Sequence, residues 1–185
     1  MNFKLGMRIP PKIGSEGIEK AAKWASGIQL DVLDVPALTP EVKRNCDTAG
    51  IGIGSVDAVH MSQLLSKDDS RRANAVEEVK KQMTEMAPLG GRVMFMCLVP
   101  EDHSLPRRES FAIWKDTFPD LIRHAEREGV GHGQVKWDQV AVRLERIGYR
   151  GAISIELEDH RYWGSIESER QGIVKAVEHL ELYFK

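Results

Sequence analysis

Residues Gly151 to Asp159 read GAISIELED, and this stretch decides how the chain folds. Apolar and polar residues alternate along it, as they do on the two faces of an extended strand. The apolar face holds Ile153, Ile155 and Leu157, and the polar face holds Ser154, Glu156 and Glu158. A segment that ends in IGYRG precedes the stretch, and an amphipathic segment follows it. The pattern therefore favours a strand in a βα series, whose sheet is covered by helices.

The carboxylate of Glu156 is the first functional candidate. A charged group on the inner face of such a sheet is costly to bury unless it is paired, hydrogen-bonded or bound to a metal ion. The same alternation also fits a surface glutamate near a strand end. Both interpretations stay open on the pattern alone.

Four more strands are predicted upstream. They cover Phe3 to Ile9, Leu30 to Val35, Ile51 to Val56 and Arg92 to Val99. The fourth is apolar almost throughout, which is typical of a buried parallel strand. Helices are predicted between them, at about residues 14–27, 39–50, 67–87 and 109–128. Thr39 caps the second helix with Pro40 at its first position, and Pro119 is expected to kink or restart the fourth.

The βα rhythm breaks after Val130. A fifth strand is due there, but residues 129–137 read GVGHGQVKW, which is rich in glycine and does not alternate. We expect an irregular loop at 129–135 and a helix from Trp137 to Ile147. Two consecutive helices with no strand between them are the anomaly of this chain.

Composition excludes several classes of function. The chain has 185 residues, 42% hydrophobic and 29% charged, with a net charge of −2 at pH 7. This balance favours neither nucleic acid nor an anionic membrane as a partner. No apolar run approaches the roughly 20 residues that span a bilayer, and the start lacks the apolar core of a signal peptide. Cys46 and Cys97 have no metal-type spacing, so free thiols and a cytoplasmic location are expected.

Several segments resemble the sugar isomerase and epimerase family related to xylose isomerase. They are MRIPPKIGSEGIEKAAKWA (7–25), LDVLDVP (30–36), TPEVKRNCDTAGI (39–51) and HGQVKWDQVAVRLERIGYRGAISIELED (132–159). The resemblance implies an eight-stranded (βα) barrel with a divalent metal ion at its C-terminal mouth. Residues 1–130 resemble the first four units, and residues 131–185 resemble the end of the seventh unit and the eighth.

The resemblance therefore implies a single domain, residues 1–185, with an incomplete barrel. A complete (βα)8 barrel needs roughly 200 residues or more. The fold class expected is α/β, with about five parallel strands flanked by helices, in the order eight, one, two, three, four. Because this sheet has exposed edges, we also expect a homo-oligomer that buries strand four, strand eight or both.

The resemblance assigns Glu156 as a metal ligand and a possible catalytic base. The family's other three metal ligands, and the second glutamate of its proton-transfer pair, have no counterpart in the sequence. The family uses a divalent metal ion such as Mn, Mg, Co or Zn, and we expect no tight binding here. Further candidates lie at or just after the C-terminal ends of predicted strands, where (βα) enzymes keep functional groups, and could contact a sugar hydroxyl or a phosphate: Arg8, Asp34, Asp57, His60 and His103. Trp163 follows the last strand, where its aromatic ring could form the floor of a sugar-binding site.

Three functions are compatible with these features. The first is a shortened relative of the sugar isomerases and epimerases that lacks isomerase activity. The alternative is an active metal-dependent aldose–ketose isomerase or C3 epimerase on a small sugar or sugar phosphate, with Glu156 as ligand or base. The third is a metal-dependent endonuclease of a related branch, against which the net charge and the missing ligands argue.

Overall fold

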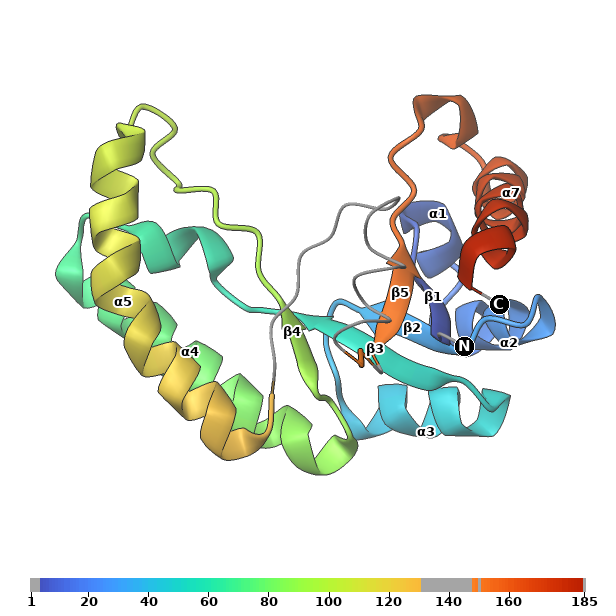
Figure 1. Cartoon of the computed structure of the whole chain (residues 1–185), viewed down its shortest axis with the longest axis horizontal. Coiled ribbons are helices and arrows are strands. Elements are labelled where there is room, and N and C mark those ends of the chain that lie inside the picture. Colours follow the sequence, from blue (N-terminus) through green and yellow to red (C-terminus); the bar gives the residue numbers. More distant parts are fainter. Residues whose placement is uncertain (1–3, 131–147, 150, 185) are drawn as a thin grey trace. The chain divides into compact units, whose positions relative to one another are not determined.

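Five strands form one sheet in the computed structural model of the chain (Figure 1), which describes residues 4–130, 148–149 and 151–184. The strands are β1 (Lys4–Arg8), β2 (Val32–Val35), β3 (Gly52–Asp57), β4 (Val93–Phe95) and β5 (Ala152–Ile155). Their order is β4-β3-β2-β1-β5, and β1 pairs in parallel with both β2 and β5, as β3 does with β4. Both the predicted strand order and the class, an incomplete α/β barrel with flanking helices, are confirmed.

Strand β1 shows how the sequence pattern becomes packing. Leu5 and Met7 are fully buried, whereas Lys4 is exposed and Arg8 half-buried. Gly6 lies between Val32 of β2 and Ser154 of β5 in the strand register. A Cβ atom at Gly6 would collide with the Val32 side chain and carbonyl, so glycine allows these strands to approach closely.

Strand β4 is shorter than its apolar sequence predicts. Only Val93–Phe95 pairs with β3, in a register that runs from Ser55↔Val93 to Asp57↔Phe95. Because β3 ends at Asp57, the residues after Phe95 have no strand to pair with. The expectation of a wholly buried strand is also wrong, since Met94 is 2% exposed but Val93 is 40% exposed. Its position at one end of the sheet explains this, because an edge strand has a neighbour on one side only.

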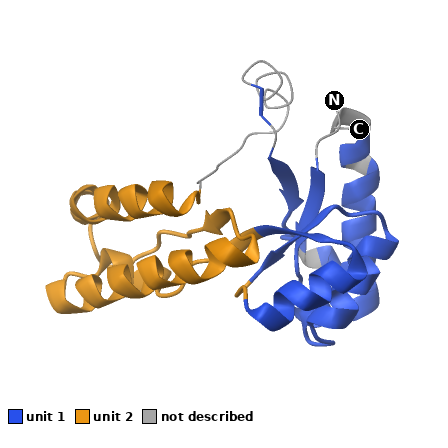
Figure 2. Ribbon diagram, turned by 90° about the horizontal axis from the view of Figure 1, so that it is seen from below, with its two compact units in different colours: residues 1–35, 39–54, 134–185 blue, residues 36–38, 55–133 orange. Residues whose placement is uncertain are grey.

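The chain divides into two compact units (Figure 2), each described here by itself. Unit 1 comprises residues 1–35, 39–54 and 134–185, and unit 2 comprises residues 36–38 and 55–133. Unit 1 holds β1, β2 and β5 with the helices α1 (Pro11–Gly14), α2 (Ile18–Gly27), α3 (Pro40–Ala49) and α7 (Ile166–Phe184). Unit 2 holds β4, α4 (Asp69–Met86) and α5 (Arg107–Glu128), with short 3-10 turns at Met61–Leu65 and Ala87–Leu89.

Helix α3 begins and ends as predicted. The Thr39 hydroxyl accepts a hydrogen bond from the Val42 amide at 3.2 Å, and Pro40 occupies the first turn. Gly50 follows the helix with φ 72°, a left-handed conformation that glycine adopts without strain.

A buried carboxylate joins α7 to α1. Glu169 is 3% exposed and accepts hydrogen bonds from the backbone amides of Lys12, at 3.0 and 3.2 Å, and of Ile13, at 3.0 Å. These amides belong to the first turn of α1, where no intrahelical acceptor exists. The next residue, Arg170, forms an ion pair with Glu16 at 2.7 Å. The C-terminal helix is therefore fixed to the segment that directly follows β1.

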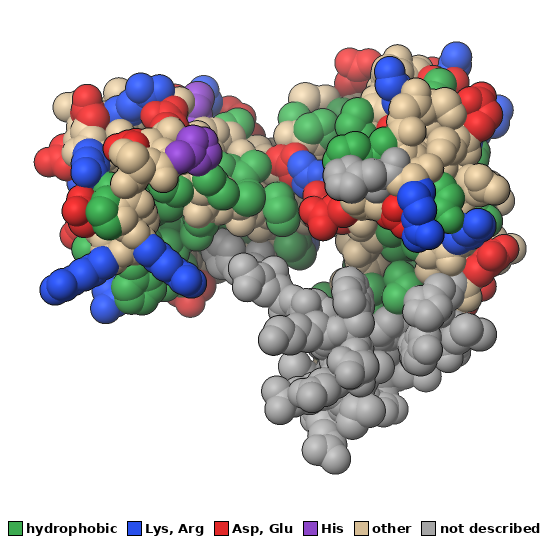
Figure 3. Space-filling model, turned by 90° about the horizontal axis from the view of Figure 1, so that it is seen from above, with side chains coloured by type: hydrophobic (Ala, Val, Ile, Leu, Met, Phe, Trp, Pro, Cys, Tyr) green, Lys and Arg blue, Asp and Glu red, His purple; other side chains and the backbone are tan. Residues whose placement is uncertain are grey.

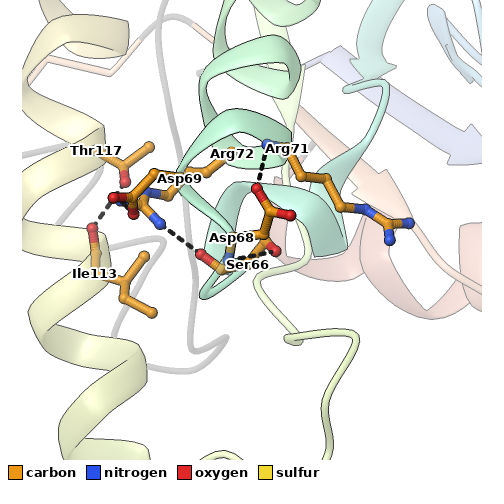
Figure 4. Close-up of polar contacts among 7 residues, drawn as sticks. All are labelled: Ser66, Asp68, Asp69, Arg71, Arg72, Ile113 and Thr117. Atoms are coloured by element: carbon orange, nitrogen blue, oxygen red, sulfur yellow. Dashed lines mark hydrogen bonds and ion pairs between the residues drawn. The ribbon is translucent and has the colours of Figure 1, made fainter.

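In unit 2, the start of α4 is held by polar contacts from the preceding residues (Figure 4). Asp68 accepts a hydrogen bond from the Arg71 amide at 3.0 Å, as a helix cap. The Arg72 guanidinium donates to the Ser66 carbonyl at 2.6 Å.

Helix α5 is one helix from Arg107 to Glu128, with Pro119 inside it. The Thr117 hydroxyl donates a hydrogen bond to the Ile113 carbonyl at 2.8 Å, within the same helix.

Two predictions fall wholly or mainly outside the described residues: the irregular loop at 129–135 and the helix from Trp137 to Ile147. Within the described part, Gly129 closes α5 in a left-handed conformation and Val130 is buried. None of the helices in the described part is both long and apolar enough to cross a bilayer.

Candidate functional site

A polar cluster lies at the C-terminal ends of three neighbouring strands in unit 1. Arg8, the last residue of β1, is paired in register with Asp34 of β2. On the other side of β1, Ser154 of β5 is paired with Gly6, two residues before Arg8. Since alternate residues of a strand share a face, Arg8, Asp34 and Ser154 lie on one face of the sheet. Together with Glu156, which follows β5, they form what we name the strand-end cluster.

Asp34 is the buried member of the strand-end cluster, at 8% exposure. The Ser154 hydroxyl donates a hydrogen bond to its carboxylate. Gly54 of β3 leaves the space that this carboxylate fills, because a Cβ atom there would collide with Asp34 Oδ1. A buried carboxylate needs such a donor, so Ser154 and Gly54 together allow Asp34 to lie where it does.

Glu156 and Arg8 are the accessible members of the cluster. Arg8 Nε lies 3.4 Å from Glu156 Oε1, and the two side chains are 31% and 51% exposed. Of the two interpretations of Glu156, the structure favours the exposed glutamate near a strand end, because β5 ends at Ile155 and Glu156 is the residue after it. The pairing of β1 with β5 runs from Lys4↔Ala152 to Met7↔Ile155, so Arg8 and Glu156 are the next residues along the two strands. The Glu156 carboxylate therefore lies beside the Arg8 guanidinium.

The described residues do not fit a divalent metal ion. In residues 4–130, 148–149 and 151–184, no three His, Cys, Asp or Glu side chains gather in a way that could hold one. A divalent ion takes several oxygen or nitrogen ligands. Here Glu156 instead lies beside the Arg8 guanidinium, which repels a cation. What the cluster offers is two carboxylates, a guanidinium and a hydroxyl, which together donate and accept hydrogen bonds.

Three other predicted site residues belong to unit 2. Asp57 ends β3, and its backbone carbonyl accepts a hydrogen bond from Gln82 Nε2 at 2.8 Å. His60 is exposed and has φ 54°, in a turn that leads into the 3-10 turn at Met61–Leu65. His103 is exposed in the loop between β4 and α5. Their role as site residues stays a prediction.

Trp163 lies in unit 1, in the loop between β5 and α7. Its indole Nε1 donates to the Leu157 carbonyl at 3.2 Å, and the side chain is 54% exposed. This bond holds the ring against the segment that follows Glu156. An exposed aromatic ring in this position is compatible with the predicted floor of a sugar site.

Sequence reasoning did not connect Gly54 with Asp34 and gave Ser154 no role. The alternation of GAISIELED places Ser154 and Glu156 on one face, which was the available signal. Their partners Asp34 and Arg8 are distant in sequence, so these contacts required the strand register.

No profile of a known protein family matches the chain, and no curated protein matches it. Solved structures do match. D-psicose 3-epimerase from Clostridium cellulolyticum H10, crystallised with D-tagatose, aligns over 99% of this chain and 100% of its own, at 11% identity and a TM-score of 0.76.

Two further matches are of the same kind. D-allulose 3-epimerase from Methylomonas sp. aligns over 98% of each chain, at 14% identity and a TM-score of 0.74. The 3-keto-D-glucoside 4-epimerase from E. coli covers 98% of this chain and 88% of its own, at 13% identity and a TM-score of 0.62. At these identities the likeness concerns the fold. This chain therefore shares its fold with these sugar epimerases.

Proposed function

We propose that this chain is a shortened relative of the metal-dependent sugar isomerases and epimerases that binds a small sugar and lacks isomerase turnover. The observation that carries the proposal is the ion pair between Arg8 and Glu156, whose nitrogen and oxygen are 3.4 Å apart. Glu156 stands where the resemblance implies a metal ligand. A guanidinium beside that carboxylate neutralises the charge that would attract a divalent ion.

The strand-end cluster supports sugar binding by its chemistry. A polyhydroxylated ligand needs several hydrogen-bond donors and acceptors close together, and a guanidinium, two carboxylates and a hydroxyl supply both. Arg8 and Glu156 are 31% and 51% exposed, so both can be reached from solvent. The matched structures are named as epimerases of sugars, which makes a sugar the first ligand to test.

Isothermal titration calorimetry of metal-stripped protein with D-fructose tests binding. We expect saturable binding in the millimolar range that is weakened in Arg8→Met and in Asp34→Asn. The matched control is Arg108→Met, since Arg108 is exposed in the first turn of α5 in unit 2. A heat signal indistinguishable from dilution, or one unchanged in both cluster variants, would contradict the proposal.

The alternative function, an active metal-dependent isomerase or C3 epimerase, is favoured by one observation. The Glu156 side chain is 51% exposed and its partner is at 3.4 Å, so an added cation can reach the carboxylate and compete with Arg8 for it. Titration with Mn²⁺, beside Glu156→Gln, and a ketose-to-aldose assay distinguish the two functions. Sub-micromolar binding that is lost in the variant, together with turnover, would establish the active enzyme.

Self-association is also part of the proposal. Strand β4 lies at one end of the sheet, and Val93 on this strand is 40% exposed. An edge strand with an exposed apolar residue is a surface on which chains associate.

A further inference from the structure

The segment between β5 and α7 fixes a large aromatic ring directly after the strand-end cluster. Trp163 is 54% exposed, and its indole Nε1 donates a hydrogen bond to the Leu157 carbonyl at 3.2 Å. Leu157 directly follows Glu156, so this bond brings the indole to the residue next to the accessible carboxylate. On the face drawn in Figure 3, hydrophobic side chains likewise lie among charged ones. Such a combination suits a ligand that has both an apolar and a polar side.

The turn that carries this ring is held by hydrogen bonds. The backbone amide of Arg161 donates to the Asp159 carboxylate, and that of Tyr162 donates to the Asp159 carbonyl, both at 3.0 Å. Both amides belong to the 3-10 turn directly before Trp163. The Tyr162 hydroxyl accepts a hydrogen bond from Lys175 Nζ of α7 at 3.2 Å. The ring is thus held before a ligand arrives, which lowers the entropy cost of binding.

Helix α7 carries a glycine where this turn packs on it. Gly172 lies inside the helix, where glycine is less favourable than alanine. A Cβ atom at Gly172 would come within 2.8 Å of Tyr162 Cγ and 2.9 Å of Leu157 Cδ1. Tyr162 directly precedes Trp163, and the Leu157 carbonyl accepts the hydrogen bond of its indole. Gly172 therefore provides the space in which the support of the Trp163 ring packs.

A fixed aromatic ring beside polar groups distinguishes two forms of a sugar. A closed sugar ring has a face of C–H groups that packs on an aromatic ring, and its hydroxyl groups are directed from the rim. An open-chain sugar has no fixed apolar face, and it loses more internal rotation when it binds. Arg8 and Glu156 supply donors and an acceptor for hydroxyl groups, and Trp163 supplies the apolar surface.

We propose that Gly172 positions Trp163 as an apolar wall of the sugar site, and that this wall selects closed-ring sugars over open-chain ones. The inference rests on the proposed function, sugar binding, and adds the form of the sugar and the residues that select it. Gly172 is a positioning residue, because it acts through Tyr162 and Leu157 on the indole.

Two probes that cannot interconvert test the selection. Methyl β-D-fructopyranoside has a ring that cannot open, and D-mannitol is a chain that cannot close. Affinities come from backbone amide shifts in NMR titrations, and the Trp163 indole signal is assigned by its loss in Trp163→Phe. We expect the glycoside to shift this signal and to bind roughly tenfold more tightly than D-mannitol. Trp163→Ala should abolish the preference, and Trp163→Phe should retain most of it.

Gly172→Ala tests the positioning role, with circular dichroism to verify the fold. It should move the Trp163 indole signal without any sugar and reduce the preference to that of Trp163→Ala, whereas general damage to the site would weaken both probes alike. Tyr162→Ala removes the support without adding atoms to α7 and should have the same effect. Gly27→Ala is the matched control, because a Cβ atom there meets no atom within 4 Å, and it should change neither signal nor preference.

Equal affinities of the wild type for the two probes would overturn the inference. So would an indole signal and a preference that neither Gly172→Ala nor Tyr162→Ala changes. If D-fructose binds and Arg8→Met weakens its binding while Trp163→Ala does not, the inference fails and the proposed function stands. If D-fructose does not bind at all, both fail together.

Discussion

At the scale of single residues, the strand-end cluster depends both on its polar atoms and on the space beside Gly54 that the Asp34 carboxylate fills. Asp34 is 8% exposed, and its carboxylate is accommodated because β3 carries glycine at position 54. The Ser154 hydroxyl then provides a donor for it. A buried carboxylate without this space and this donor would destabilise the fold.

Gly54→Ala should lower the free energy of unfolding by about 1–3 kcal/mol, because the added methyl group displaces the Asp34 carboxylate. Gly27→Ala is the matched control, since a Cβ atom at Gly27 in α2 meets no atom within 4 Å. This control should be neutral or slightly stabilising. Urea denaturation measures both, and equal effects of the two substitutions would refute the steric role of Gly54.

The two cysteines differ in accessibility, and both are free, as the sequence predicts. Cys46 is buried, and burial raises the pKa of its thiol, with a further increase from Asp47. Cys97 is exposed. Since the thiolate is the reactive form, a thiol reagent at neutral pH should modify Cys97 rapidly and Cys46 only in denaturant. Rapid labelling of Cys97→Ser in the folded state would contradict this expectation.

At the scale of helices and strands, Glu169 links α7 to α1 by a contact that the sequence pattern does not reveal. Glu169→Ala should cost about 2–4 kcal/mol of stability, because it leaves buried amides of α1 without an acceptor. Glu169→Gln should cost less, since it keeps one acceptor oxygen. Glu167→Ala, an exposed position in the same turn of α7, is the control and should cost under about 1 kcal/mol. Thermal melts that show equal losses for the two alanine variants would disprove the anchor.

The ion pair between Lys80 of α4 and Asp120 of α5 should make unit 2 sensitive to acid. The hydrogen bond from Lys80 holds the pKa of the Asp120 carboxyl below its ordinary value. As the pH falls, the Asp120 carboxyl is therefore protonated in the unfolded chain before it is protonated in the folded one. Its contribution to stability is lost as the pH falls through the lowered folded-state pKa. Asp120 is 47% exposed, so solvent reduces the effect.

Asp120→Asn should flatten the decline of the melting temperature below about pH 4, the ordinary range of this carboxyl. Asp116→Asn, at an exposed carboxylate of the same helix, should leave the decline unchanged. Identical acid profiles for wild type and Asp120→Asn would show that the pair does not contribute.

At the scale of the whole molecule, the net charge of −2 distinguishes the sugar-related functions from the endonuclease alternative. A protein that binds DNA through phosphates needs clustered cations, and its affinity falls steeply with salt. The anisotropy of a labelled duplex should therefore stay constant on titration, even at low salt. Binding that weakens as salt is added would revive the endonuclease alternative.

The sequence by itself indicated most of the described strands and helices, although it predicted one helix at about residues 14–27 where the structure has α1 and α2. Alternation in residues 3–9 and 151–159, and the Thr39–Pro40 start of α3, are local signals, and each corresponds to an element of the structure. The lengths of the strands were harder to predict from the sequence. GAISIELED alternates to Asp159, but β5 ends at Ile155, which is also the last residue of β5 that pairs with β1. The length of a strand depends on its pairing with a neighbour, and no single stretch of sequence contains that information.

Only the tertiary structure decided which polar groups meet. Arg8 and Glu156 were both candidates from the sequence, but their pairing at 3.4 Å depends on β5 lying beside β1, although they are far apart in the chain. Ser154 and Asp34 meet across β1 for the same reason, and Gly54 matters only because β3 lies next to β2. In the sequence, Glu169 is an ordinary acidic residue in the first turn of a helix, but in the structure it is buried and accepts hydrogen bonds from the amides of α1. Burial and partners are properties of the packed sheet and helices, because they depend on contacts between residues that are far apart in the chain.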